Sequence, residues 1–291
     1  DSDTSFKQTK NAFPSNARFI NAHPVIELNT QITANYAMNC YCWISPDGLS
    51  IFWTREGETY ETPGIYQATR KTSEQPFKDI RLVLPDARIA SLSPDNLEIV
   101  CLYDADGDGL QKELCSSRRK MVEDPFDVPQ RITVFQTIEN PKGTAFTQNG
   151  LELLILSSKS RSKPDSNQIL HSTRVSTSAN WGVPAPVVVS ENKSIENLTW
   201  PAFDATRQFL IFGGSVPNMP SRELPYVARQ NTSDPLEYDN IIPVLIDSQS
   251  LNTRAVRYCD ATGELFFTKL VGSPPHNQKE LWVAQKAMLA R

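Results

Sequence analysis

The residues best suited to hold a metal ion gather in one short segment, Asp104-Ala105-Asp106-Gly107-Asp108-Gly109. Asp104, Asp106 and Asp108 stand at alternate positions and offer three carboxylates, while the glycine permits the tight turn of a calcium loop. The twelfth position of such a loop takes glutamate as its last ligand, but Cys115 stands there. The segment therefore predicts either a structural calcium site or an ordinary Asp-Gly hairpin turn.

The three histidines, His23, His171 and His276, do not form a catalytic pattern. None accompanies a serine nucleophile motif, and the chain contains no G-x-S-x-G, H-E-x-x-H, P-loop or G-x-G-x-x-G segment. We therefore assign no catalytic residue from motifs.

Aromatic and arginine side chains offer a different chemistry, because aromatic rings stack on sugars or grip peptide side chains and arginine binds carboxylates. Six such residues fall on segments that we expect to line a central channel: Tyr41, Trp43, Trp200, Tyr258, Arg254 and Arg257. The aromatic members could equally pack in the core between strands.

Composition limits the function classes. The 29 basic and 33 acidic residues leave a net charge of −4, which disfavours binding to nucleic acid through bulk charge. Hydrophobic residues make up 39% of the chain, enough for a folded core. With 21 prolines and only 12 glycines, the chain fits a β-protein with rigid turns better than a doubly wound nucleotide-binding fold.

The longest uncharged stretch, residues 28–46, is interrupted by polar residues, so we expect no membrane insertion. The start of the chain shows no signal peptide.

Five turn segments, each followed by an apolar run, divide the chain into repeats. Ser45-Pro46-Asp47-Gly48 and Ser93-Pro94-Asp95-Asn96 are the clearest, and weaker copies begin at Thr147, Asp204 and Asp260. A strand-like segment follows each turn and ends on a basic residue or glutamine, which lies 25 to 27 positions after the start of the turn. These residues are Arg70, Arg118, Arg174, Arg229 and Gln285. We expect the arginines to reach Asp47 or Asp95 within their own repeat and to serve the fold.

A third element, an aromatic or apolar anchor before a proline-flanked strand, follows the first four repeats. The predicted strands are residues 80–84, 132–135, 186–189 and 241–246. The fifth repeat has no room for this element, and its counterpart is the N-terminal segment near Pro24 to Leu28.

Each repeat of about 50 residues therefore holds four short strands, as a propeller blade does. We predict an all-β fold: a single five-bladed β-propeller domain with four-stranded blades near residues 35–86, 87–138, 143–192, 196–250 and 251–291. The N-terminal strand, within residues 20–30, is expected to close the ring by pairing with residues 279–284 of the last blade.

The turn and third-strand pattern resembles the TolB-like β-propeller repeat, the S-P-D-G relative of WD repeats. The resemblance implies a periplasmic or secreted domain that binds a protein or glycan partner. It implies fold rather than activity.

Two function classes follow. The first is a non-catalytic propeller that binds a protein or carbohydrate at the funnel or a loop face. The alternative is a glycoside hydrolase, since five-bladed propellers include arabinanase-type enzymes with three acids around the funnel. The expected inner strands contain no Asp or Glu, which favours binding, and an acid with a raised pKa at the funnel mouth would favour hydrolysis. A structural sensor domain from a larger protein is a third possibility.

Cys101 and Cys115 lie symmetrically about Asp108, so a hairpin places them opposite one another. They are expected to be paired free thiols, or a cross-strand disulfide if the protein is exported.

Overall fold

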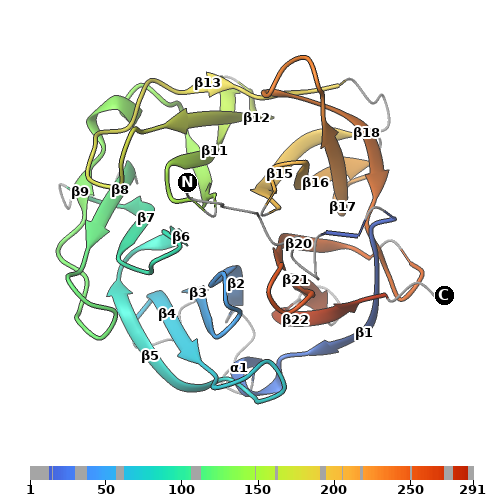
Figure 1. Cartoon of the computed structure of the whole chain (residues 1–291), viewed down its shortest axis with the longest axis horizontal. Coiled ribbons are helices and arrows are strands. Elements are labelled where there is room, and N and C mark those ends of the chain that lie inside the picture. Colours follow the sequence, from blue (N-terminus) through green and yellow to red (C-terminus); the bar gives the residue numbers. More distant parts are fainter. Residues whose placement is uncertain are drawn as a thin grey trace, which may run out of the picture.

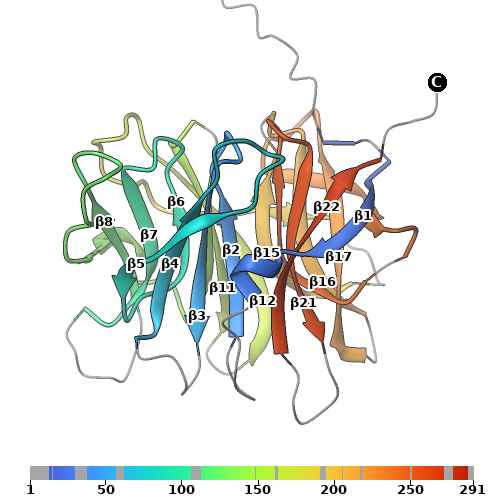
Figure 2. The ribbon, with the colours of Figure 1, turned by 90° about the horizontal axis from the view of Figure 1, so that it is seen from below.

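The computed structural model describes residues 13–14, 16–29, 38–56, 62–105, 113–147, 149–160, 163–190, 195–204, 206–216, 219–249, 251–271 and 278–287. Five small sheets, most of whose strand pairs are antiparallel, stand in a ring around a central axis (Figure 1). A parallel pair between Met38 and Lys279 joins the sheets of blades 1 and 5. The chain is therefore the predicted all-β, five-bladed propeller. Strands such as β2 (Met38–Ile44), β3 (Ser50–Glu56) and β21 (Glu264–Val271) run roughly along the axis of the ring, whereas the outer strands β5 (Lys78–Pro85) and β1 (Arg18–Pro24) cross it obliquely (Figure 2).

The blades follow one another along the chain. Blade 1 contains β2 (Met38–Ile44), β3 (Ser50–Glu56), β4 (Gly64–Thr69) and β5 (Lys78–Pro85). Blade 2 contains β6 (Arg88–Leu92), β7 (Glu98–Tyr103), β8 (Glu113–Arg118) and β9 (Gln130–Arg131). Blade 3 contains β10 (Pro141–Phe146), β11 (Glu152–Ser160), β12 (Lys163–Thr173) and β13 (Ala185–Pro186). Blade 4 contains β15 (Glu196–Phe203), β16 (Phe209–Val216), β17 (Met219–Gln230) and β18 (Glu237–Pro243).

Blade 5 takes strands from both ends of the chain. It contains β20 (Thr253–Cys259), β21 (Glu264–Val271) and β22 (Gln278–Lys286), and β1 (Arg18–Pro24) pairs antiparallel with β22 as its outer strand. The segment expected to form this strand, Pro24 to Leu28, does not do so. The strand ends at Pro24, and Ile26–Asn29 forms the short helix α1, where Val25 and Leu28 turn inward to the core.

The outer strands differ most from the prediction. In blade 2 the expected strand at residues 132–135 is a 3-10 helix, Thr133–Phe135, and β9 lies just before it. The segment after β13 crosses to the next blade, where β14 (Val188–Val189) pairs parallel with β18. Similarly, β19 (Leu245–Ile246) leaves blade 4 and pairs parallel with β1. The outer layer therefore ties neighbouring blades together, which a repeat-by-repeat reading does not predict.

The core consists of five apolar clusters, one at each seam between neighbouring blades. Both faces of each sheet pack against a neighbour, because a four-stranded blade cannot bury its faces alone. The N-terminal segment contributes Phe13 and Phe19 to the seam of blades 4 and 5, and α1 contributes Leu28 to the seam of blades 5 and 1.

The arginines after the third strands are structural, but they pair differently from the prediction. In blades 1 to 3 the equivalent residues are Arg70, Arg119 and Arg174, so Arg118 is displaced from the series by one position, and Gln230 rather than Arg229 holds the place in blade 4. Each of the three donates from Nε to a carbonyl of its own turn, on Gly48, Asn96 or Gly150, at 2.7 to 3.0 Å. Each guanidinium also lies over the anchor ring of its own blade at 4.2 to 4.6 Å; these rings belong to Phe77, Phe126 and Trp181.

The acidic partners come from the preceding blade. Arg70 pairs with Glu264 of blade 5 (Nη1 to Oε1, 3.1 Å), and Arg174 pairs with Glu98 of blade 2 (Nη1 to Oε2, 2.7 Å). Asp47 and Asp95, the expected partners, instead accept hydrogen bonds inside their turns from Leu49 N and Leu97 N. The expectation of a pair within one blade was therefore wrong, and these ion pairs tie adjacent blades.

Cys101 and Cys115 stand directly opposite one another on β7 and β8, as predicted, and both are buried. In the described part of the chain, no helix has the length and apolar character needed to cross a membrane.

Candidate functional site

All five inner strands shift register against their second strands, and in four of them the shift contains a non-glycine residue with a positive φ. Tyr41, Ile89, Trp200 and Ala255 have φ values of 48° to 57°, a region that residues other than glycine rarely occupy. The strand pairing shifts register around each of these residues. Bulges redirect side chains, and backbone strain of this kind clusters at functional sites.

The bulges of blades 1 and 4 send two aromatic rings toward each other. The rings of Tyr41 and Trp200 lie 4.3 Å apart between centroids, at an interplanar angle of 36°. These two blades are not neighbours in the ring, so the pair lies across the channel (Figure 1). Gly143 of blade 3 allows the close packing, because a Cβ there would stand 3.4 Å from the Trp200 ring and 3.3 Å from Ile89. The stack separates the channel into two ends.

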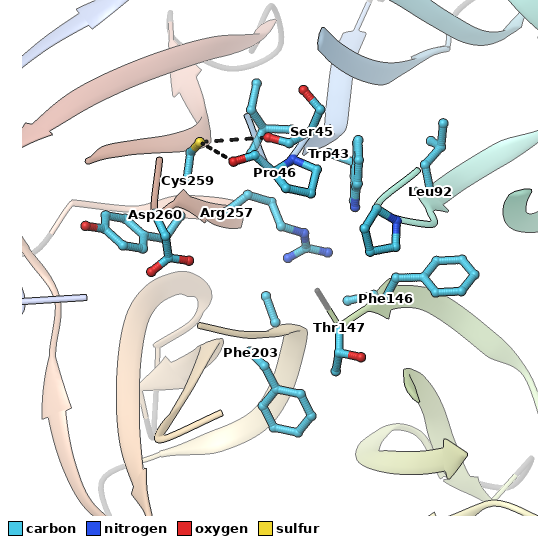
Figure 3. A pocket seen from close by; sticks show the side chains of 15 residues that line it. Trp43, Ser45, Pro46, Leu92, Phe146, Thr147, Phe203, Arg257, Cys259 and Asp260 are labelled. Carbon is cyan, nitrogen blue, oxygen red and sulfur yellow. Dashed lines mark hydrogen bonds between the residues drawn. The ribbon is translucent and has the colours of Figure 1, made fainter. Parts of the chain in front are cut away.

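At the end that carries the five turns, a cavity of about 60 Å³ lies among the ends of the inner strands. Figure 3 shows the guanidinium of Arg257 pointing into it, toward Trp43, Phe146 and Thr147. Arg257 Nη1 donates to the carbonyls of Val256 (2.8 Å) and Trp200 (3.2 Å). Its Nε is buried and has no hydrogen-bond partner.

No ion pair joins Arg257 to a carboxylate within the residues that the structure describes. Asp260 lines the same cavity, but in Figure 3 its carboxylate points away from the guanidinium. Burial lowers the pKa of Arg257 to about 10, so the group remains charged at neutral pH. Burial raises the pKa of the neighbouring Cys42 thiol to about 11, so this thiol supplies no negative charge. An uncompensated cation therefore faces the cavity.

Two of the predicted channel residues also line this cavity but pack mainly in the core. Trp43 is 6% exposed and packs edge-on against Phe52 at the seam of blades 1 and 2. Tyr258 is 8% exposed and contacts the rings of Phe13 and Phe19. Burial raises the pKa of its phenol, as expected for a core tyrosine.

Arg254 lies beyond the stack, at the other end of the channel, and faces a carboxylate that the sequence did not reveal. Its Nε stands 3.2 Å from Oε2 of Glu223, which comes from β17. The hydroxyl of Thr199 donates to Oε1 of the same carboxylate. Burial raises the pKa of Glu223, against the lowering effects of Thr199 and Arg254. Gly213 leaves room for this group, since a Cβ there would collide with both the hydroxyl and the carboxylate.

The structure thus divides the six predicted channel residues between two ends and a central stack. The sequence analysis missed Glu223 because this residue lies on a third strand, whereas acids were sought on the inner strands. The only feature of the sequence that marks Glu223 is its acidic side chain directly before the apolar run of that strand. The inner strands were also expected to lack acids, but β15 begins at Glu196. Of the predicted calcium ligands, Asp104 follows β7, while Asp106 and Asp108 lie outside the described residues.

No protein-family model and no curated protein matches the chain. Among solved structures, it is similar to a GH43_1 enzyme from Xanthomonas citri, with a TM-score of 0.61 and 12% identity, covering 92% of this chain and 91% of that one. It is also similar to the α-L-arabinofuranosidase PaAbf62A from Podospora anserina, with a TM-score of 0.56 and 8% identity, covering 92% and 95%. TolB from Acinetobacter baumannii gives a TM-score of 0.51 and 12% identity over 85% of this chain, which spans 54% of that structure.

These low identities show a shared propeller fold, and they support the predicted TolB-like arrangement at that level. The S-P-D-G repeat type stays a prediction. Because one propeller scaffold carries both TolB and glycoside hydrolases among these structures, function has to be argued from the site.

Proposed function

We propose that the protein is a non-catalytic binding propeller that holds a carboxylate group of its partner on Arg257, at the turn-bearing end of the channel. The observation that carries this is the charged, unpaired guanidinium in the cavity. A part-buried charge without an acidic partner is unfavourable, and a bound carboxylate would compensate it through charge-assisted hydrogen bonds.

The size of the cavity supports a terminal group rather than a sugar ring. Water occupies about 30 Å³ per molecule in the liquid, so 60 Å³ holds roughly two waters or one carboxylate. The partner would therefore insert an acidic group, such as a peptide carboxylate, while its remaining contacts fall on the surrounding turns.

Acetate and acetamide form a matched pair of probes, equal in shape and different in charge. We expect acetate, but not acetamide, to raise the melting temperature of the protein in a saturable way. Arg257→Gln should abolish this stabilisation. Arg254→Gln is the control, because it removes the same charge from the same strand beyond the Tyr41–Trp200 stack. Equal stabilisation by both probes, or equal loss in both variants, would contradict the proposal.

Arg257→Gln serves as a second test. Removing an uncompensated buried charge should leave the free energy of unfolding unchanged or raised, whereas removing a structural ion pair would lower it by several kcal/mol. A large fall in stability would assign Arg257 to the fold.

Glu223 favours a second candidate, glycoside hydrolysis. Its raised pKa is typical of a general acid, and it lies close to Arg254 at the channel end opposite the turns. The mechanism needs a second carboxylate about 5 to 10 Å away. The test is hydrolysis of aryl α-L-arabinofuranosides by the intact protein and by Glu223→Gln. Turnover that the substitution abolishes would replace the binding proposal, and we expect none.

A further inference from the structure

The seam of blades 2 and 3 contains a groove of about 570 Å³ on the side of the ring, away from the central channel. We define the blade 2–3 groove by Ser116, Arg118, Arg131, Ser178, Asn180 and Trp181. Its volume falls within the range of small-ligand sites, about 300 to 1,000 Å³.

Positive charge dominates its walls. The side chains of Arg118 and Arg131 are 48% and 35% exposed, and the buried guanidinium of Arg174 lies over the Trp181 ring at 4.2 Å. Glu98 is the acid in the lining, and it is shared by Arg118 at 3.2 Å and Arg174 at 2.7 Å. Arg131 pairs with Glu113 just outside the groove. The described ion pairs thus set three arginines, Arg118, Arg131 and Arg174, against two glutamates, Glu98 and Glu113. Arg118 uses only Nη2 in its described hydrogen bonds, to Glu98 and to the carbonyl of Thr177.

The wall also contains an unsatisfied donor. Trp181 is 7% exposed, and its Nε1 has no hydrogen-bond partner. A buried donor without an acceptor costs free energy, and an acceptor that reached it would remove that cost.

The equivalent groove at the seam of blades 5 and 1 offers a comparison, because a carboxylate of the chain itself lies in its wall. It has the same floor, an Arg70–Glu264 pair beside the anchor Phe77, and a volume of about 380 Å³. There the chain supplies its own carboxylate: Glu27 of α1 accepts the backbone N–H of Phe77 at 2.8 Å. In blade 3 the anchor at this position is Trp181, and the helix beside it is the 3-10 helix Thr133–Phe135. Thr133 and Val134 of this helix line the groove, and neither supplies a carboxylate.

From these observations we propose that the blade 2–3 groove binds a small carboxylate ligand, held by Arg118 and Arg131 and by the hydroxyl and amide groups of Ser178 and Asn180. The volume suits a molecule of the size of a uronic-acid disaccharide or an acidic dipeptide. This site is independent of the channel, so either proposal can fail without the other.

The test is isothermal titration of the intact protein with digalacturonate and with aspartyl-aspartate, each beside a neutral counterpart, cellobiose or asparaginyl-asparagine amide. We expect at least one acidic probe to bind and both neutral ones to fail. Arg118→Gln and Arg131→Gln should each weaken the binding at least about tenfold, the usual cost of one charge-assisted hydrogen bond or more. The acidic probe that binds identifies the source of the carboxylate.

Lys120→Gln is the matched control, because it removes an exposed positive charge two residues from Arg118 and outside the groove. It should leave the affinity unchanged, as should Arg257→Gln in the channel. Melting curves of all variants show whether each is folded, and the exposed Arg118 is not expected to affect folding. Failure of both acidic probes, or equal weakening by Lys120→Gln, would overturn the proposal.

Discussion

Glu152 is the most heavily bonded carboxylate at the seam of blades 3 and 4. Its Oε2 lies 2.7 Å from Nε2 of His171 and 2.9 Å from Nη1 of Arg207. Burial acts to raise its pKa, but the hydrogen bond from His171 and the charge of Arg207 lower it overall. This cluster replaces the Arg–Glu pair of other seams, because blade 4 has Gln230 where blades 1 and 3 have arginine.

A lowered pKa means that the unfolded chain binds more protons than the folded one as the pH falls. The stabilisation by Glu152 is therefore fully present above its ordinary pKa of 4.5 and is lost as the pH drops through the folded value. We expect Glu152→Gln to reduce the free energy of unfolding by about 1–3 kcal/mol at neutral pH. The difference from the parent protein should shrink in urea titrations below pH 4.5. The exposed Glu123→Gln should show no such trend, and a difference independent of pH would contradict the assignment.

For single residues, the sequence predicted which residue types belong to the candidate site better than it predicted what each side chain contacts. Six aromatic and arginine residues were predicted to line the channel, and that prediction stays untested. The level of the channel at which their side chains lie depends on the bulges of the inner strands. A one-residue register change at Ala255 puts Arg254 and Arg257 on opposite sides of the stack, and no periodicity in the sequence reports that change.

Among elements, the arginines that follow the third strands of blades 1 and 3 link each of these blades to the preceding one. Arg70 forms an ion pair with Glu264, and Arg174 forms one with Glu98. Both glutamates stand at the start of the second strand of the preceding blade. In blade 1, which precedes the blade of Arg119, the second strand begins with Ser50 instead of glutamate. Accordingly its Nη2 is buried without a partner, and burial lowers its pKa to about 10.

Ser50→Glu should supply the missing link between blades 1 and 2. The new carboxylate would compensate a buried cation, so we expect the free energy of unfolding to rise by about 1 kcal/mol and the melting temperature by about 2–4 °C. Ser50→Gln is the control for size without charge. If the two variants melt alike, the link depends on packing and not on the ion pair.

Inner and second strands could be predicted because tight turns and apolar runs mark them locally. Outer strands were harder to predict. The strand predicted at residues 80–84 lies within β5, but β9, β13, β14 and β19 contain two residues each. Their positions depend on pairing with a neighbouring blade, as β14 does with β18, and such pairing is a tertiary choice with no local pattern.

At the scale of the whole ring, β1 lies between the edges of two other strands, β22 and β19. It pairs antiparallel with β22 and parallel with β19, and the carboxylate of Asp247 accepts the N–H groups of Asn21 and Ala22. Without β1, both neighbouring strands would expose unpaired backbone, a known route to aggregation.

Two adjacent residues of β1 allow a matched test of this closure. Phe19 is fully buried in the seam of blades 4 and 5, whereas Ile20 is 40% exposed on the opposite face of the strand. Phe19→Ala should lower the free energy of unfolding by about 3–5 kcal/mol, because it empties a packed core site. Ile20→Ala should cost about 0.5 kcal/mol or less, as an exposed substitution does.

Deleting residues 1–30 removes the strand altogether and should cause aggregation or a non-cooperative transition, measured by calorimetry and light scattering. A truncated protein that melts cooperatively at the parent temperature would show that blade 5 is stable with three strands and that β1 does not hold the ring closed.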